Sequence, residues 1–113
     1  MNFQIDNQNN FSIVSSTIDR LNAANAPELK SILVKLNKDG VNNITIDLSK
    51  TSYCDSSGLS ALLTGNRLCK DSGGKFVLCG LQANVNKMIE IAQLHRVLNI
   101  EEQLEEAKSH FTD

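Results

Sequence analysis

The residues best placed to do chemistry are two adjacent serines, Ser56 and Ser57, which follow Asp55 and precede Gly58. Aspartate is a preferred cap at the start of a helix, and a helical pattern begins directly after the glycine. The N-terminus of a helix presents unpaired backbone N–H groups and the positive end of the helix dipole. A phosphate on either serine would meet donors already directed at it, so this segment predicts a modifiable serine.

A serine beside a glycine also suggests nucleophilic catalysis, which requires a base within hydrogen-bond reach. The elbow of the α/β-hydrolases has a glycine two residues before its serine, where this chain has Cys54 or Asp55. Of the two histidines, His95 lies in a Gln-Leu-His-Arg segment and His110 lies near an end expected to fray. No GxxxxGK[ST] or GxGxxG phosphate loop occurs either. We therefore expect a protein that is not an enzyme and needs no cofactor.

Charge and composition restrict the class of partner. The net charge is −2, and the lysines and arginines are scattered rather than interleaved with aromatic residues, so direct binding of nucleic acid is not expected. No apolar run approaches the ~20 residues that cross a bilayer, and the first residues do not resemble a signal peptide. We expect a cytoplasmic protein without membrane insertion, folded as one domain over residues 1–113.

The three cysteines, Cys54, Cys69 and Cys79, have no CxxC spacing and are not arranged with the histidines as metal ligands. No metal site is predicted. We expect the thiols to be small buried apolar groups. A redox role for Cys54, which lies beside the serines, stays open.

Hydrophobic periodicity predicts the elements that lead to the serines. Alternating residues over 3–6 and 11–14 flank an Asn-rich turn and predict a β-hairpin. A helical stripe follows, with Asn25 as its predicted cap and Asp39-Gly40 as its end. Residues 44–48 alternate at period two and predict a strand. A helix between two strands favours a parallel crossover.

A second helix is predicted directly after the serines, because Leu59, Leu62, Leu63 and Cys69 fall on one helical face before Ser72-Gly73-Gly74 ends it. Close packing against the sheet would explain Gly65 within this helix.

The remainder of the chain repeats this alternation. Residues 75–79 form a nearly continuous apolar run, typical of a strand buried on both faces. A third helical stripe runs from Val85 to Ala92, a short extended piece covers 97–100, and a last helix with an acidic first turn covers 101–109. The order predicts an α/β fold: a small mixed sheet of four to five strands, an N-terminal hairpin followed by parallel crossovers, with about four helices.

With this order of elements, Asp47-Leu48-Ser49 followed by Tyr53-Cys54-Asp55-Ser56-Ser57-Gly58-Leu59 resembles the core motif of the STAS domain family. The chain most resembles the free-standing bacterial anti-sigma-factor antagonists. The similarity extends over nearly the whole chain, since residues 20–29 match the family's loop into its first helix and Gly73-Gly74-Lys75 matches its return into the fourth strand.

The resemblance implies a protein that switches partners. The unphosphorylated antagonist binds an anti-sigma factor that is also a serine kinase with a histidine-kinase-like ATP-binding fold, and a PP2C-type phosphatase acts on the phosphoserine. In the family the second serine of the motif is phosphorylated, which maps to Ser57 and leaves Ser56 as the lesser candidate.

The resemblance also implies a partner-binding surface made of loop and helix-start residues: Asp19, Asn22, Asn25, Asp55, Ser56, Ser57, Gly58 and Ser60. Asp19 and Asn22 stand where the family commonly has a glycine and an aspartate, so for both a role as turn residues with φ > 0 stays open beside binding. Ser60 stands where glycine is frequent, a mild change on an exposed helical face. Asp47 is expected to hydrogen-bond the loop at its strand's end.

A second hypothesis is compatible with the same resemblance. STAS domains also serve as accessory or scaffold subunits of membrane transport or stress-signalling complexes. The intact Asp55-Ser56-Ser57 segment favours the phosphorylated switch, because a structural subunit has no need of a modifiable serine.

Overall fold

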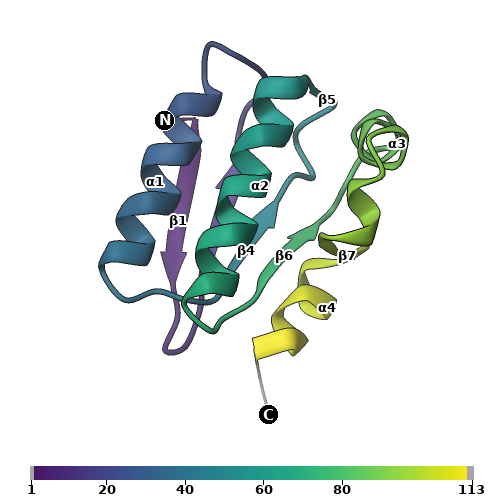
Figure 1. The fold of residues 1–113 in the computed structure, drawn as a ribbon. Helices are drawn as coiled ribbons and strands as arrows, with labels where there is room; N and C mark the ends of the chain where they lie inside the picture. The colour runs from purple at the N-terminus through teal and green to yellow at the C-terminus, as the bar shows by residue number, and fades with distance from the viewer. Residues whose placement is uncertain (1, 112–113) are drawn as a thin grey trace.

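A five-stranded mixed sheet forms the centre of the computed structural model, which describes residues 2–111 (Figure 1). The antiparallel hairpin consists of β1 (Phe3–Asn7) and β2 (Ser12–Ser16). Three strands then add in parallel next to β2: β4 (Ile44–Asp47), β6 (Phe76–Cys79) and β7 (Asn99–Glu101). The predicted mixed sheet with its hairpin and parallel crossovers is confirmed. The ends of the predicted domain, residues 1 and 112–113, lie outside the described residues.

The described part of the chain contains four α-helices, which cover both faces of the sheet. The helices α1 (Ala26–Lys38) and α2 (Ser56–Asp71) lie side by side on one face, with their N-termini at the same end (Figure 1). The short helix α4 (Leu104–Lys108) packs on the other face, against β4, β6 and β7. Helix α3 (Ala83–Ile91) lies at the end of the sheet where α1 and α2 begin.

Strand β6 shows that the centre of the sheet is buried on both faces. Its four residues are all buried, and they alternate between two cores. Phe76 and Leu78 pack in the core shared with α1 and α2, while Val77 and Cys79 pack in the core beneath α4. The strand predicted from the apolar run at 75–79 is therefore confirmed.

Two very short strands escaped prediction from sequence. β3 (Arg20–Leu21) pairs in parallel with β5 (Tyr53–Cys54) and forms a separate two-stranded sheet. This ladder brings the loop before α1 beside the start of α2, although more than thirty residues separate the two strands in sequence.

The predicted close approach at Gly65 is confirmed. A Cβ atom at this position would lie 2.4 Å from Cε1 of Phe76 and 2.9 Å from Cδ1 of Leu33. Real Cβ atoms do not approach other atoms so closely, so the glycine allows α2 to rest against both β6 and α1.

The start of α1 differs from the prediction. Asn25 occupies the N-cap position, but its side chain makes no capping hydrogen bond. Its Oδ1 accepts from the backbone N–H of Asn22 at 2.9 Å, and its Nδ2 donates to the carbonyl of Arg20 at 2.8 Å. The side chain thus organises the preceding loop, and its predicted capping role is wrong.

Near the C-terminus two predicted boundaries move, and one residue expected at a frayed end is held. The stripe of α3 ends at Ile89, since Ala92 lies beyond the helix and is exposed. The last helix begins at Leu104 rather than Glu101, because Glu101 pairs with Cys79 in the sheet. His110, expected near a frayed end, is held there, with its Nε2 2.6 Å from Oε2 of Glu101.

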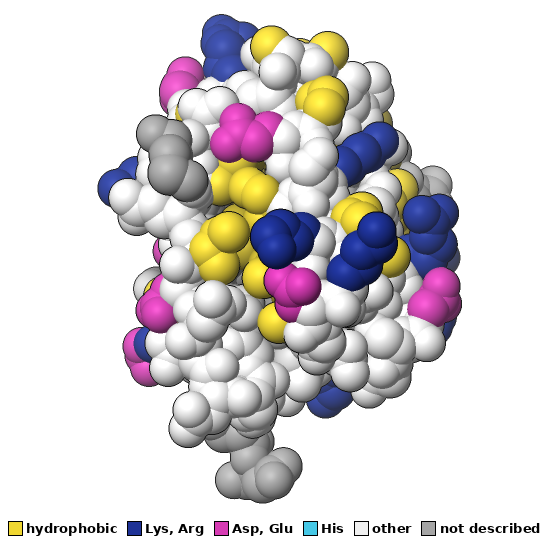
Figure 2. Space-filling model, turned by 90° about the vertical axis from the view of Figure 1, so that its left-hand side faces the viewer, with side chains coloured by type: hydrophobic (Ala, Val, Ile, Leu, Met, Phe, Trp, Pro, Cys, Tyr) yellow, Lys and Arg dark blue, Asp and Glu magenta, His cyan; other side chains and the backbone are white. Residues whose placement is uncertain are grey.

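The side of the molecule formed by β1 and α1 is shown in Figure 2. Strand β1 is an edge of the sheet, and four of its five residues are exposed. On this face lysine and arginine side chains are interspersed with aspartate and glutamate, and hydrophobic side chains gather near the centre.

Candidate functional site

The start of α2 is capped by Asp55, as predicted. Its Oδ1 accepts a hydrogen bond from the backbone N–H of Gly58 at 3.0 Å, and its main-chain carbonyl accepts from Leu59 at 3.0 Å. Within residues 2–111 no hydrogen bond is found for the hydroxyl of Ser56 or Ser57. Because Asp55 alone caps the helix, neither serine hydroxyl is needed for the fold.

The first three residues of α2 differ in exposure. Ser56 is exposed, Ser57 is half-buried, and Gly58 is buried. A Cβ atom at Gly58 would lie 2.6 Å from Sγ of Cys54 and 2.8 Å from the carbonyl oxygen of Leu21. The glycine therefore lets the helix begin directly against β3, which fixes where the serines emerge.

The loop residues Asp19 and Asn22 shape the backbone next to the serines. The carbonyl of Asp19 accepts from the N–H groups of Ser52 and Tyr53, and its Oδ1 accepts from the Ser52 hydroxyl. Oδ1 of Asn22 accepts from the N–H of Ala24 at 3.0 Å. Among the described non-glycine residues only Gln93 has a positive φ. Neither Asp19 nor Asn22 has a positive φ, but both hydrogen-bond within the loop, as the alternative role of a turn residue implies.

A pocket of about 280 Å³ opens between the N-termini of α1 and α2. It brings together three predicted residues, Ser56, Ser57 and Ser60, and it does not include Asp19, Asn22 or Asn25. Its other lining residues come from α1 and the loop before it: Ala23, Ala26, Pro27 and Lys30. Ser60 is exposed, as predicted for this position.

Lys30 is a site residue that the sequence does not predict. It is a half-buried basic residue in the pocket of Ser57, and no ion pair is found for it within residues 2–111. Its ammonium group could offset the charge of a phosphate on either serine. Lys30 precedes Ser56 and Ser57 by 26 and 27 positions, so no local sequence pattern links it to them. Only the packing of α1 on α2 identifies it as part of the site.

An exposed arginine–tyrosine pair adjoins the same loop. The guanidinium of Arg20 lies 5.0 Å from the centroid of the Tyr53 ring, and the tyrosine is 38% exposed. Tyrosine and arginine are enriched at protein interfaces, which makes this pair a further candidate contact. The pairing of β3 with β5 places the two residues opposite each other.

The cysteines are buried, as predicted, and their chemistry is suppressed. Burial, reinforced by the neighbouring negative charge of Asp55, raises the pKa of Cys54 to about 12. Burial also raises the pKa of Cys69 and that of Cys79 to about 11. Thiols with such pKa values stay protonated near neutral pH, which argues against the redox role left open for Cys54.

The loop between β4 and the serines is held from both ends. Oδ1 of Asp47 accepts from the N–H of Ser49 at 2.9 Å, which confirms the predicted role of this aspartate. The buried hydroxyl of Thr51 donates to the carbonyl of Ile18 at 2.8 Å and lies 2.7 Å from the hydroxyl of Ser16. The loop that leads to the serines is therefore tied to β2 and to the segment that follows it.

Residues 2–111 contain neither a cluster of metal-ligating side chains nor a helix that could span a membrane. No group of three or more His, Cys, Asp or Glu side chains is placed to hold a metal ion. No helix in this range has the length and apolar character that crossing a membrane requires.

Comparison with known proteins gives consistent matches. The model of the STAS domain family matches residues 2–107. The anti-sigma-B factor antagonist of Staphylococcus aureus is 25% identical over 85 residues, which cover 75% of this chain and 79% of that protein.

Solved structures share the fold. An anti-sigma factor antagonist from Mycobacterium paratuberculosis superposes with a TM-score of 0.87 at 20% identity, covering 98% of this chain and 93% of that one. The Bacillus cell fate determinant SpoIIAA in its phosphorylated form gives a TM-score of 0.74 at 17% identity, covering 95% and 96%. Both the sequence match across residues 2–107 and the shared architecture lead to one conclusion: the chain belongs to the STAS domain family.

Proposed function

We propose that this chain is an anti-sigma-factor antagonist that acts by switching partners. Its unphosphorylated form binds an anti-sigma factor that is also a serine kinase with a histidine-kinase-like ATP-binding fold. Phosphorylation of Ser57 by that kinase ends the binding, and a PP2C-type phosphatase reverses it. The relatives named anti-sigma-B factor antagonist support the partner class, and SpoIIAA, solved in unphosphorylated and phosphorylated forms, supports the modification.

The observation that carries the proposal is that the residue that caps α2 and the residue open to modification are different. Asp55 caps the helix, while the half-buried Ser57 projects from the first turn without a hydrogen bond of its own among the described residues. A phosphate there would add about −1.5 to −2 charge units. The positive end of the helix would stabilise that charge by roughly 0.3–1 kcal/mol, so the domain stays folded.

The switch acts at the interface with the partner. A dianion that must be buried against a second protein loses its hydration, at a cost that reaches several kcal/mol unless new partners replace the water. Each 1.4 kcal/mol is about tenfold in affinity, so a penalty of two or three such steps separates a bound state from a free one. Binding, rather than catalysis, is the proposed activity, since the pocket around Ser57 is lined by one lysine and no histidine.

Ser57→Ala tests the modification site. Incubation with the cognate kinase and radiolabelled ATP is expected to label the wild-type chain and Ser56→Ala, and to leave Ser57→Ala unlabelled. Ser56→Ala is the matched control because it removes the neighbouring hydroxyl from the same pocket. Labelling of Ser57→Ala to the wild-type extent would place the site elsewhere. Recovery of transporter subunits without any kinase in a pull-down would instead favour the accessory-subunit hypothesis.

A further inference from the structure

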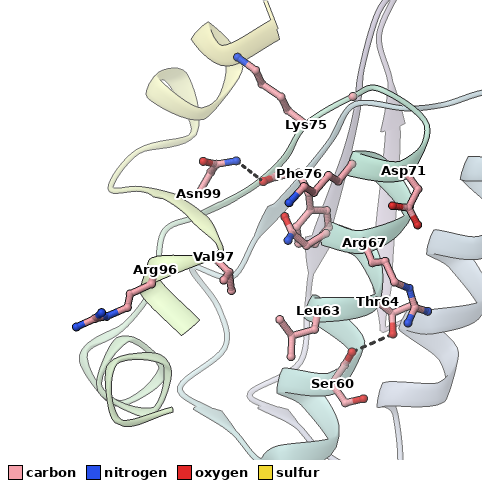
Figure 3. A pocket seen from close by; sticks show the side chains of 13 residues that line it. Ser60, Leu63, Thr64, Arg67, Asp71, Lys75, Phe76, Arg96, Val97 and Asn99 are labelled. Atoms are coloured by element: carbon pink, nitrogen blue, oxygen red, sulfur yellow. Dashed lines mark hydrogen bonds between the residues drawn. The ribbon is translucent and has the colours of Figure 1, made fainter. Parts of the chain in front are cut away.

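A second hollow on the described surface adjoins the serine pocket. It has a volume of about 920 Å³ and lies between α2 and the segment from Arg96 to Asn99 (Figure 3). Leu63 and Val97 lie on its two sides, and Phe76 of β6 contributes to its floor. From the sheet, the hollow is lined by Phe76, the first residue of β6, and by Asn99, the first residue of β7.

Four basic side chains surround this groove. Arg67, Lys70, Lys75 and Arg96 are all exposed, and Asp71 is the carboxylate among the lining residues. No ion pair is found for any of the four within residues 2–111. This groove is therefore a local basic surface on a chain whose net charge is −2.

The arrangement of the charges distinguishes between kinds of ligand. In Figure 3 the side chains of Arg67, Lys75 and Arg96 extend in three different directions, and those of Arg67 and Arg96 point outward from opposite sides of the hollow. A small anion is bound by a few groups that converge on one point, whereas these charges are spread along a surface. Phe76 is only 1% exposed, so its ring offers no open face for stacking of a nucleic acid base. Val97, by contrast, is 56% exposed and can receive an apolar side chain.

The groove is also continuous with the serine pocket. Ser60, one turn beyond Ser56, lines both of them. A protein that covers Ser57 and extends along α2 therefore reaches the four basic residues without leaving the surface.

We propose that the groove between α2 and β7 binds an acidic amphipathic segment of the protein partner that covers Ser57. Carboxylates of the segment pair with the surrounding cations, and its apolar side chains contact Leu63 and Val97. This proposal rests on the proposed function for the identity of the partner. The structure supplies the chemistry of the groove independently.

Charge reversal on α2 tests the proposal with the cognate kinase. Arg67→Glu combined with Lys70→Glu is expected to weaken kinase binding about 10-fold or more, because two attractive contacts become repulsive. Lys38→Glu combined with Lys87→Glu is the matched control, since it changes the charge equally at residues that do not line the groove. The thermal midpoint of each variant verifies folding. Binding of the groove variant equal to that of the control, while Ser57→Asp still weakens binding, would overturn the groove and leave the proposed function intact.

A peptide titration tests the groove without the kinase, so it still decides if the wild-type chain binds no kinase. The probe is a synthetic 14-residue peptide with glutamates on one helical face and leucines on the other, about 21 Å long as a helix. It is expected to shift the backbone NMR signals of Arg67, Lys70 and Val97, and to lose affinity about 10-fold in the groove variant. Equal binding of a peptide with lysines in place of glutamates would overturn the proposal. The same shifts with inorganic phosphate alone would also overturn it and indicate a small-anion site.

Discussion

Ser57→Asp is expected to weaken binding of the kinase about 10-fold or more while leaving the thermal midpoint of the domain nearly unchanged. The fold tolerates the new carboxylate because it lies in the first turn of α2, where the helix dipole favours negative charge by about 0.3–1 kcal/mol. The interface does not tolerate it, because burial against a partner removes its hydration. Isothermal titration calorimetry and thermal denaturation measure the two effects separately.

Ser57→Asn is the matched control for this experiment. Asparagine has nearly the same size as aspartate and is neutral, so it tests whether shape alone disturbs the interface. We expect it to bind the kinase within a few-fold of the wild-type chain. An unfolded Ser57→Asp, or equal affinities of the two variants, would contradict the electrostatic account.

Leu62→Ala is expected to have the opposite effect to Ser57→Asp: a large loss of folding stability without a change in the phosphorylation of Ser57. Leu62 is fully buried on α2 within the core shared with α1 and the sheet. Truncation of a buried leucine to alanine costs about 2–5 kcal/mol through lost burial and the cavity that remains. Urea denaturation should show a lower midpoint with an unchanged slope.

Val34→Ala provides the comparison for Leu62→Ala. Val34 is 39% exposed on α1, so its truncation is expected to change the free energy of unfolding by no more than about 1 kcal/mol.

The Leu62→Ala variant should still be phosphorylated on Ser57 at the wild-type rate, at a temperature where it remains folded. If Leu62→Ala lowered the free energy of unfolding by less than about 1 kcal/mol, Leu62 would not be part of the core as described.

Sequence periodicity is sufficient to predict a helix or strand wherever that element buries a regular face. The apolar run of β6 and the leucines of α2 gave correct predictions, because burial on both faces and on one helical face leaves a repeating pattern. The cap at Asp55 was also predictable, since its hydrogen bond to Gly58 is local.

Prediction failed where a competing interaction decided the structure. Asn25 has the right residue type for a helix cap, but its amide bonds to the loop that precedes it. Glu101 suits the first turn of a helix, but pairing with Cys79 draws it into the sheet. The strands β3 and β5 have two residues each, which is too short for any period to show.

The candidate site was predictable only in its local part. The serines and their cap lie in one short segment, so the sequence alone indicated them. Lys30 and the pair formed by Arg20 and Tyr53 depend on contacts between distant parts of the chain, through α1 on α2 and β3 on β5. The groove beside α2 likewise depends on contacts between distant parts of the chain, because its lining residues come from α2, β6 and the segment from Arg96 to Asn99.

The central claim is that a phosphate on Ser57 controls the affinity for the kinase. The most direct test is the dissociation constant of the kinase for two preparations of the same chain, one unphosphorylated and one fully phosphorylated on Ser57. The dianion should weaken binding about 100-fold or more, beyond the effect of the single charge of Ser57→Asp. Equal dissociation constants for the two preparations would contradict the account.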